Sequence, residues 1–310
     1  MITRIAAERV RALNDATART GDYVLYWMQS SHRTEENPSL VYAVERADRL
    51  HLPLVVYFGL FPSYPESSLR HFRFMLEGLG EVSRSLESLG IRFVLRTEPP
   101  EKGVITLADH AALVVTDRGY LKVHRAWYST VAAQCRCPLI QVEGNVVVPV
   151  ETASQKEEYA AATFRPKVTR LLDRFLVPGD EPACRVSWPA GAEPGSEPTD
   201  DAALAALLDR LPLDRAARPV PGGRGGTAAG LVRLDAFLRD GLARYPEQHG
   251  RAHLPDGTSR LSPYLHFGHL GPRAVALAVR AADAPAEARD AFLEQLIVRR
   301  ELAINFCARN

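Results

Sequence analysis

The feature that most constrains the fold is an alternation of apolar runs with helical segments between residues 23 and 150. Five runs are rich in β-branched and aromatic residues: YVLYWM, PLVVYFGL, IRFVL, ALVVT and PLIQV. Helix-like stretches separate them at residues 39–50, 68–89 and 122–135. Strands that are apolar almost throughout are typical of a parallel sheet covered by helices on both faces. The sequence therefore predicts a doubly wound α/β parallel-sheet domain over residues 1–150.

The composition changes after this domain. Residues 177–226 contain eight prolines and seven glycines, which favours a long interdomain connector over residues 151–226. From residue 227 onward the pattern is helical, in TAAGLVRLDAFLRDGLARY, PRAVALAVRAA and ARDAFLEQLIVRRELAINFCARN. An all-helical C-terminal domain is therefore predicted over residues 227–310. Two domains also suit a chain of 310 residues, which exceeds what one hydrophobic core usually organises.

Charge and hydropathy exclude several classes of protein. A net charge of +1 gives no general attraction to nucleic acid or to an anionic membrane, so any DNA-binding surface must be local. Arginines and acids interrupt the first fifteen residues, which do not form a signal peptide. The most apolar stretch, residues 52–61, is too short to cross a bilayer. We expect a cytoplasmic monomer without a membrane segment.

Metal and nucleophile motifs are missing from the sequence. Cys135 and Cys137 are one residue apart, which is not a zinc-ligand spacing, and Cys184 and Cys307 are isolated. The nine histidines show no metal spacing, and neither G-x-S-x-G nor H-E-x-x-H occurs. We therefore predict no metal site, and we expect reduced, mostly buried thiols.

Three hydroxyl residues stand close together near the start of a helix. Thr258, Ser259 and Ser262 lie beside Pro263, which can open a helix. Hydroxyls and free helix N–H groups together suit a pyrophosphate. A capping box without a ligand accounts for the same residues equally well. The residues alone leave both interpretations open.

The last helical segment places arginine among apolar residues. Arg299 shares helical spacing with Phe292, Leu296, Ala303 and Phe306. Arginine does not enter an apolar interface without a partner. Glu294 or Glu301 could supply a carboxylate, and a ligand phosphate could bind the guanidinium instead. The residues alone favour the carboxylate.

The ordered segments also resemble class II cyclobutane pyrimidine dimer photolyases, of the photolyase/cryptochrome family, along nearly the whole chain. The matching segments are VLYWMQSSHRTEENPSLVYAVERA, LRHFRFMLEGLGEV, VVTDRGYL, NVVVPVETASQKEEYAAATFRPKV, TSRLSPYLHFGHL and FLEQLIVRRELAINF. The resemblance implies an α/β antenna-type domain joined to a helical FAD-binding domain. It implies light-driven repair of UV-damaged DNA by electron transfer from reduced FAD to a flipped dimer. An antenna chromophore, a deazaflavin or a folate, is also implied, although no residue selects one.

The resemblance further implies roles for individual residues. Contacts to the flavin and its phosphates map onto Tyr245, Thr258, Ser259, Leu261 and Ser262.

Two further positions map onto the catalytic part of the family's site. Arg299 corresponds to an arginine near both flavin and lesion. Gln295 stands where the family usually has a glutamate that hydrogen-bonds the carbonyl oxygens of the dimer. An amide donates a hydrogen bond but supplies neither a proton nor a charge, so we expect reduced turnover.

Family members continue beyond Asn310 through helices that carry the rest of the flavin pocket, the aromatic electron relay and much of the DNA-binding surface. No tryptophan follows Trp188, so that relay is not expected here. A chain truncated at this point is expected to bind FAD weakly or not at all and to expose an apolar face. Two alternatives stay open: a cryptochrome-like flavin photoreceptor without repair, and a truncated, non-catalytic photolyase fragment.

Overall fold

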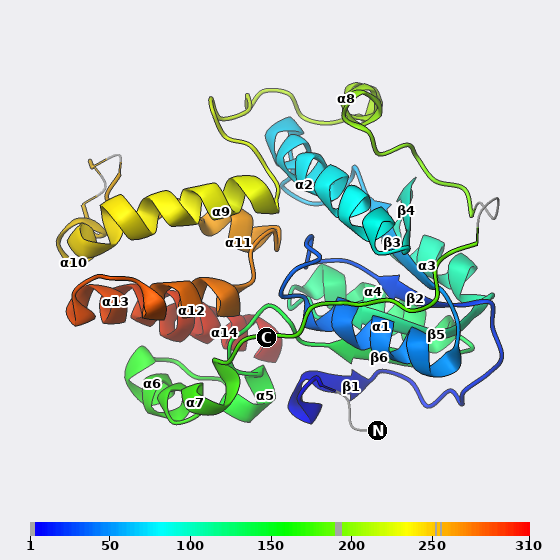
Figure 1. Ribbon diagram of the computed structural model, residues 1–310, viewed down its shortest axis with the longest axis horizontal. Helices are drawn as coiled ribbons and strands as arrows, with labels where there is room; N and C mark the ends of the chain where they lie inside the picture. Colours follow the sequence, from blue (N-terminus) through cyan, green and yellow to red (C-terminus); the bar gives the residue numbers. More distant parts are fainter. Residues whose placement is uncertain (1–3, 190–193, 252, 255) are drawn as a thin grey trace. The chain divides into compact units, whose positions relative to one another are not determined.

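The chain folds into two compact units, coloured along the sequence in Figure 1. The computed structural model describes residues 4–189, 194–251, 253–254 and 256–310. The α/β unit consists of Met1–Gly144 and Asp180–Gly226. The helical unit consists of Asn145–Gly179 and Thr227–Asn310. Each unit is therefore built from two separate stretches of chain.

A six-stranded sheet forms the centre of the α/β unit. Its order is β1-β6-β5-β2-β3-β4, and every neighbouring pair is parallel except β1 with β6. The strands are β1 (Val10–Ala12), β2 (Tyr23–Trp27), β3 (Leu54–Leu60), β4 (Arg92–Thr97), β5 (Ala111–Asp117) and β6 (Leu139–Val142). The predicted fold class is confirmed. The short antiparallel edge strand β1 was not predicted.

Helices cover both faces of this sheet, which explains why its central strands are apolar throughout. On β2, Val24 and Tyr26 lie in one core cluster with α1 and α2, whereas Leu25 and Trp27 lie in the opposite cluster with α3 and α4. These helices are α1 (Pro38–Leu50), α2 (Leu69–Ser88), α3 (Pro100–Ala108) and α4 (Lys122–Gln134). Successive side chains of a strand point to opposite faces, so both core layers come from the same strands.

The predicted connector, residues 151–226, does not run as one linker in the structure. Its first part folds into α5 (Val150–Ala153), α6 (Ala161–Thr169) and α7 (Leu172–Phe175) of the helical unit. Its second part carries α8 (Asp201–Arg210), whose Leu204 and Leu207 enter the core of the α/β unit. Residues 190–193 lie outside the described part. Buried leucines hold the second part in place despite its many prolines and glycines.

The remaining helices complete the helical unit, which contains no strand within the described residues. They are α9 (Thr227–Ala236), η2 (Phe237–Gly241), η3 (Leu242–Arg244), α10 (Tyr245–Gln248), α11 (Ser262–His266), α12 (Pro272–Ala281), α13 (Ala286–Leu293), η4 (Glu294–Arg299) and α14 (Arg300–Arg309). Segments η2 and η4 are π-helical. Across the described residues, every helix is too short or too polar to span a membrane.

Candidate functional site

The predicted hydroxyl residues form an exposed loop before α11. Leu261 is buried and anchors the loop, while its N–H donates to Ser259 Oγ at 3.3 Å. Arg233 of α9 donates from Nε to the Ser259 carbonyl at 2.8 Å, which fixes the loop against that helix. The Thr258 and Ser262 side chains are exposed and make no hydrogen bond to any described residue. Their hydroxyls are therefore open to a ligand.

The first turn of α11 lacks the capping box considered from the sequence. Leu261 occupies the N-cap position, and no described side chain caps the helix. The N–H groups at the start of a helix have no partner within the helix and carry partial positive charge. The Ser262 N–H beside two exposed hydroxyls forms a donor set that suits phosphate oxygens, while Pro263 has no N–H to contribute.

Two residues, Gly257 just before this loop and Arg260 within it, set its path. Gly257 is buried, and a Cβ atom there would lie 2.9 Å from the Gln248 carbonyl oxygen. Arg260 adopts the left-handed conformation, with φ of 54°, and forms an ion pair with Asp256 at 3.4 Å. A non-glycine residue pays about 1 kcal/mol or more for this conformation, so the surrounding contacts must hold it.

Tyr245 lies in the aromatic core of the helical unit. Its ring is stacked on His249, with centroids 4.8 Å apart, and meets Phe237 and Phe292 edge-on at 5.8 Å and 5.2 Å. Burial raises the pKa of the Tyr245 hydroxyl. Phe292 lies on α13 immediately before η4, so this ring connects α10 to the segment that carries the two predicted catalytic residues.

The predicted apolar stripe of the last helix is wrong beyond Leu296. Phe292 and Leu296 are buried, but the Arg299 side chain is 56% exposed and Phe306 is 53% exposed. The cause is η4, because a π-helical turn holds more residues than an α-helical turn and shifts the following residues around the axis. Such turns occur frequently at functional sites. Arg299 thereby faces outward.

Arg299 forms an ion pair with a carboxylate, Glu294, as the residues alone favoured, but Glu294 also binds Arg165. Glu294 Oε1 lies 3.5 Å from Arg299 Nε and also accepts a hydrogen bond from Arg165 at 2.8 Å. Arg165 binds both Glu294 oxygens, and its hydrogen bonds are the main reason that the Glu294 pKa is lowered. An exposed ion pair contributes about 0–1 kcal/mol, so it leaves the Arg299 guanidinium available to an anion.

Glu301, the other carboxylate considered for Arg299, binds backbone N–H groups instead, which the sequence did not indicate. Its carboxylate is buried and accepts the N–H groups of Val147 and Val148, the latter at 3.3 Å. One turn later, Asn305 accepts the Glu158 N–H at 2.9 Å. Hydrogen bonds to these two buried side chains hold residues 145–158 against α14. The only sign of this role in the sequence is that Glu301 and Asn305 are four residues apart and so share one face of α14.

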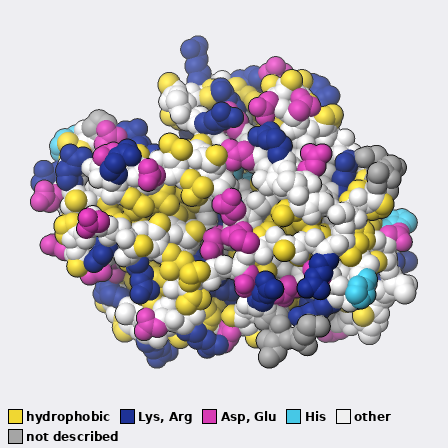
Figure 2. Space-filling model, viewed as in Figure 1, with side chains coloured by type: hydrophobic (Ala, Val, Ile, Leu, Met, Phe, Trp, Pro, Cys, Tyr) yellow, Lys and Arg dark blue, Asp and Glu magenta, His cyan; other side chains and the backbone are white. Residues whose placement is uncertain are grey.

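Gln295 is half-buried within η4, and its amide makes no hydrogen bond to the described residues. Exposed hydrophobic side chains also occur on the helical unit, at Leu231 and Val232 of α9 and at Phe306 of α14. Figure 2 shows hydrophobic side chains gathered over this unit in the region of α12 and α14. Exposed apolar surface beside polar groups marks an interaction site more often than a scattered single residue does.

The α/β unit has a second candidate site, at the carboxyl ends of its strands. The connections that follow the neighbouring strands β2 and β5 run to opposite sides, toward β3 and β6, and ligands of doubly wound sheets bind at such a point. Asp117, at the end of β5, accepts the N–H groups of Gln29 and Ser30 at 3.0 Å and 2.8 Å. Burial raises the pKa of this carboxyl to about 6. The loop after β2 is thus held by a buried charge instead of a glycine-rich turn.

Aromatic side chains gather near the same end of the sheet, and their sequence pattern did not identify them as a site. The Trp127 ring lies 6.1 Å from Phe61, 6.2 Å from Tyr64 and 5.5 Å from His124. Tyr64 and His124 also share a hydrogen bond of 3.3 Å. Trp27, in contrast, is fully buried in the core. The half-buried rings present flat surfaces on which a planar ligand could stack.

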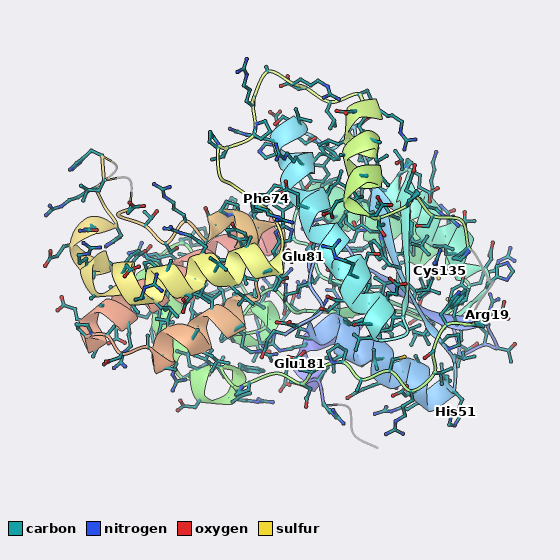
Figure 3. All side chains as sticks on the ribbon, turned by 45° about the horizontal axis from the view of Figure 1, so that its top comes forward. Arg19, His51, Phe74, Glu81, Cys135 and Glu181 are labelled. Atoms are coloured by element: carbon teal, nitrogen blue, oxygen red, sulfur yellow. The ribbon has the colours of Figure 1, made fainter. Side chains whose placement is uncertain are left out.

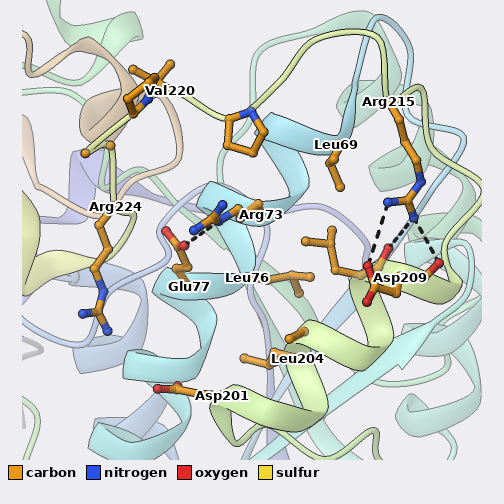
Figure 4. Close-up of a pocket in the computed structure, with 16 residues that line it drawn as sticks. Leu69, Arg73, Leu76, Glu77, Asp201, Leu204, Asp209, Arg215, Val220 and Arg224 are labelled. Atoms are coloured by element: carbon orange, nitrogen blue, oxygen red, sulfur yellow. Dashed lines mark hydrogen bonds and ion pairs between the residues drawn. The ribbon is translucent and has the colours of Figure 1, made fainter.

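A cavity of about 750 Å³ lies elsewhere in the α/β unit, between α2, α8 and residues 219–224 (Figure 4). Arg73 pairs with Glu77 at 3.0 Å along α2, and Arg215 pairs with Asp209 at 3.9 Å. None of the predicted site residues lines this cavity. The residues that the resemblance implies for flavin contact all belong to the helical unit instead.

Comparison with known proteins gives a consistent result. The DNA photolyase family model matches residues 24–186. The deoxyribodipyrimidine photo-lyase of Methanothermobacter thermautotrophicus is 43% identical over 304 residues, covering 97% of this chain and 65% of that protein. The enzyme of the same name from Potorous tridactylus is 33% identical over 291 residues, covering 92% of this chain and 53% of that protein. The chain thus spans between half and two thirds of the length of these relatives.

Solved structures support the fold. A class III photolyase from Agrobacterium tumefaciens superposes with a TM-score of 0.72 at 22% identity, covering 95% of this chain and 60% of that one. A cryptochrome from Synechocystis superposes with a TM-score of 0.76 at 17% identity, covering 94% and 62%. At these identities the likeness concerns the fold alone. Together with the family match and the identities to named photo-lyases, it confirms the predicted family: this chain belongs to the DNA photolyase family.

Proposed function

We propose that this chain supplies the α/β domain and part of the FAD-binding domain of a class II photolyase, which splits cyclobutane pyrimidine dimers in UV-damaged DNA with light. The observation that carries the proposal is the 43% identity to a deoxyribodipyrimidine photo-lyase, which runs through both units. The relative acts on pyrimidine dimers by its name, and the catalytic segment of this chain keeps an exposed arginine beside a half-buried amide.

The residues of the helical unit fit FAD by the chemistry of their donors. The exposed hydroxyls of Thr258 and Ser262, with the Ser262 N–H at the start of α11, would hold the pyrophosphate. Ser259 and Leu261 would shape this loop, and Tyr245 would support the site from the core. Reduced FAD, when bound, supplies the electron that splits the dimer.

Two residues of η4 would serve the lesion. The Gln295 amide would donate a hydrogen bond to a carbonyl oxygen of the dimer, without contributing charge. Arg299, with its outward guanidinium, would bind a phosphate or the negative charge that develops during the reaction. The exposed apolar side chains of this unit would exclude water around a flipped base.

We also propose an antenna chromophore, a deazaflavin or a folate, at the carboxyl ends of the strands in the α/β unit. The support is the cluster of half-buried rings around Trp127 and its place beside the reversal of strand order. The cytoplasmic, monomeric state expected from the sequence stays a prediction, which cell fractionation and size-exclusion chromatography would check.

The test is a light-dependent repair assay with the full chain, reduced FAD and an oligonucleotide that contains one thymine dimer. We expect dimers to disappear in blue light and to persist in the dark. Gln295→Glu should raise turnover, because a carboxyl group can supply the charge that the amide lacks. Gln134→Glu makes the same change at an exposed position of α4 and should have no effect.

The alternatives predict different results. Dimers that persist in light while FAD is bound would refute repair and favour the cryptochrome-like photoreceptor that Gln295 leaves open. A chain that gains no visible absorption on reconstitution with FAD would refute both flavin functions, and a non-catalytic fragment would be the correct description.

A further inference from the structure

Two thiols of the α/β unit lie unusually close together, at the turn between α4 and β6. Cys135 ends α4 and Cys137 stands two residues later, just before β6. Their Sγ atoms are 3.4 Å apart, although both residues are free cysteines. A disulfide bond measures about 2.05 Å, so the sulfur atoms would need to approach by only about 1.4 Å.

The turn itself is held in this shape by Asn14. The Asn14 amide nitrogen donates to the carbonyls of Cys135 and Cys137 at 3.3 Å and 3.0 Å, and its oxygen accepts the Leu139 N–H at 2.9 Å. One side chain thus binds both ends of the turn. Because the backbone is fixed, the thiols stay on the same side of the chain, while Arg136 between them is exposed.

The two thiols differ in access and in acidity. Cys135 is 8% exposed and Cys137 is fully buried. The hydrogen bond from Cys137 is the main reason that the pKa of the Cys135 thiol is lowered to about 7, and the charge of Arg19 contributes in the same direction, against the effect of burial. The same hydrogen bond and burial raise the pKa of Cys137. Cys135 is therefore the nucleophilic sulfur, and Cys137 keeps its proton.

The α/β unit also has a small polar cavity, lined in part by residues whose charges act on Cys135. Its volume is about 280 Å³, and it is lined by residues 19–22 together with Asp109 and His110. Arg19 and Asp109 are also close enough to act on the charge of Cys135, and Figure 3 shows Arg19 and Cys135 in the same part of the α/β unit. Arg19 donates to the Asp109 carbonyl at 2.5 Å, which holds its guanidinium at this cavity. A small neutral oxidant can enter such a cavity.

We propose that Cys135 and Cys137 form a redox site that a peroxide converts reversibly into a disulfide. The Cys135 sulfur attacks one oxygen of hydrogen peroxide, so that an S–O bond forms, the O–O bond breaks and the leaving hydroxide takes a proton to become water. The Cys137 sulfur then attacks the sulfenic sulfur of Cys135. An S–S bond forms, the S–O bond breaks, and the hydroxide leaves with the Cys137 proton as a second water. Two thiols are oxidised, and one peroxide is reduced.

The proximity of Cys137 affects how fast the Cys135 sulfenic acid is consumed more than how fast it forms. A lowered thiol pKa raises the thiolate fraction but reduces its nucleophilicity, so the rate advantage is small. An adjacent thiol, in contrast, reacts at a high effective concentration. The sulfenic acid on Cys135 is therefore consumed before it can be oxidised further or trapped.

The test treats the full chain with one equivalent of hydrogen peroxide in the presence of dimedone, which traps sulfenic acids. Denatured protein is then digested with trypsin and analysed by mass spectrometry. Trypsin cuts after Arg136 and separates the reduced cysteines into two peptides. After oxidation we expect both cysteines in one species with two hydrogens fewer, which dithiothreitol reverses. Cys184 and Cys307 serve as internal controls and should stay reduced.

Variants separate the roles of the two sulfurs. Cys137→Ser should increase the dimedone adduct on Cys135 by on the order of tenfold over the wild type, since no thiol resolves the sulfenic acid. Cys184→Ser should behave like the wild type. Three results would overturn the proposal: equal dimedone labelling in the wild type and Cys137→Ser, oxidation of Cys184 or Cys307 before the pair, or no linked species. The wild-type digest decides the last two even if a variant does not fold.

Discussion

Substitution of the buried Glu301 tests how residues 145–158 are held in the helical unit. In Glu301→Gln, the side chain keeps one oxygen that can accept an N–H from the backbone, but its NH2 group opposes the second donor. One buried N–H of Val147 or Val148 then loses its acceptor. Hydrogen bonds to a charged group contribute about 1.5–3 kcal/mol, so we expect a local loss of about 2 kcal/mol. That is roughly a 30-fold change in the opening equilibrium.

The assay is amide hydrogen exchange followed residue by residue in the full chain. We expect exchange at Val147 and Val148 to become roughly 30-fold faster, while the strands of the α/β unit keep their protection. Glu287→Gln, on the exposed face of α13, removes the same charge and should change exchange little. Unchanged protection at both valines would refute the role assigned to Glu301.

Three further predictions concern stability. Burial raises the Asp117 pKa from 3.8 to about 6. The protonated carboxyl group therefore contributes its full share to the free energy of unfolding below pH 3.8, and this contribution is lost as the pH rises through 6. Urea titrations should show wild-type stability falling about 2.4 kcal/mol more than that of Asp117→Asn between pH 4 and pH 7. The Lys167 hydrogen bond lowers the Glu158 pKa from 4.5 to about 2, so the stability that the ionised carboxylate contributes above pH 4.5 is lost as the pH falls toward 2. In the same urea titrations, Glu158→Gln should remove this loss of stability in acid. Gly225→Ala would place Cβ 1.8 Å from the Phe74 carbonyl oxygen, so we expect residues 219–226 to leave α2 and lose exchange protection.

The α/β unit could be predicted from the sequence because its central strands are buried on both faces. A strand such as β3 is apolar at almost every position, and a short run of this kind is typical of a strand with helices on both sides. The edge strand β1 is three residues long and exposed at Arg11 and Ala12, so it leaves no such pattern. Helix α3 contains Gly103 and β-branched residues, which weaken its helical signal.

The connector shows where composition misleads. Proline and glycine between residues 177 and 226 indicated a linker, and they do interrupt regular structure there. Yet Leu204, Leu207 and Leu211 are buried in the α/β core, and Phe164 is buried in the helical unit. Local composition reports whether a segment can form helices and strands. It does not report which surface its apolar residues will cover.

In the candidate site too, some features could be predicted from the local sequence and others could not. The exposed hydroxyls of Thr258 and Ser262 follow from local sequence, because serine and threonine beside a helix start rarely enter a core. The outward turn of Arg299 depends on the π-helical segment, which hydrophobic periodicity does not encode. The buried position of Glu301 depends on Val148, which is 153 residues away in the chain. Contacts of that range are set by the tertiary fold.

A titration of the full chain with FAD, followed by flavin fluorescence, tests the proposed flavin site. We expect saturable binding that the double variant Thr258→Ala, Ser262→Ala weakens by roughly tenfold, because two hydrogen bonds to phosphate oxygens are lost. Thr106→Ala, at an exposed position of α3, should bind FAD like the wild type. Binding that is the same with and without the Thr258 and Ser262 hydroxyls, or no binding by any of the three proteins, would contradict the proposed flavin site.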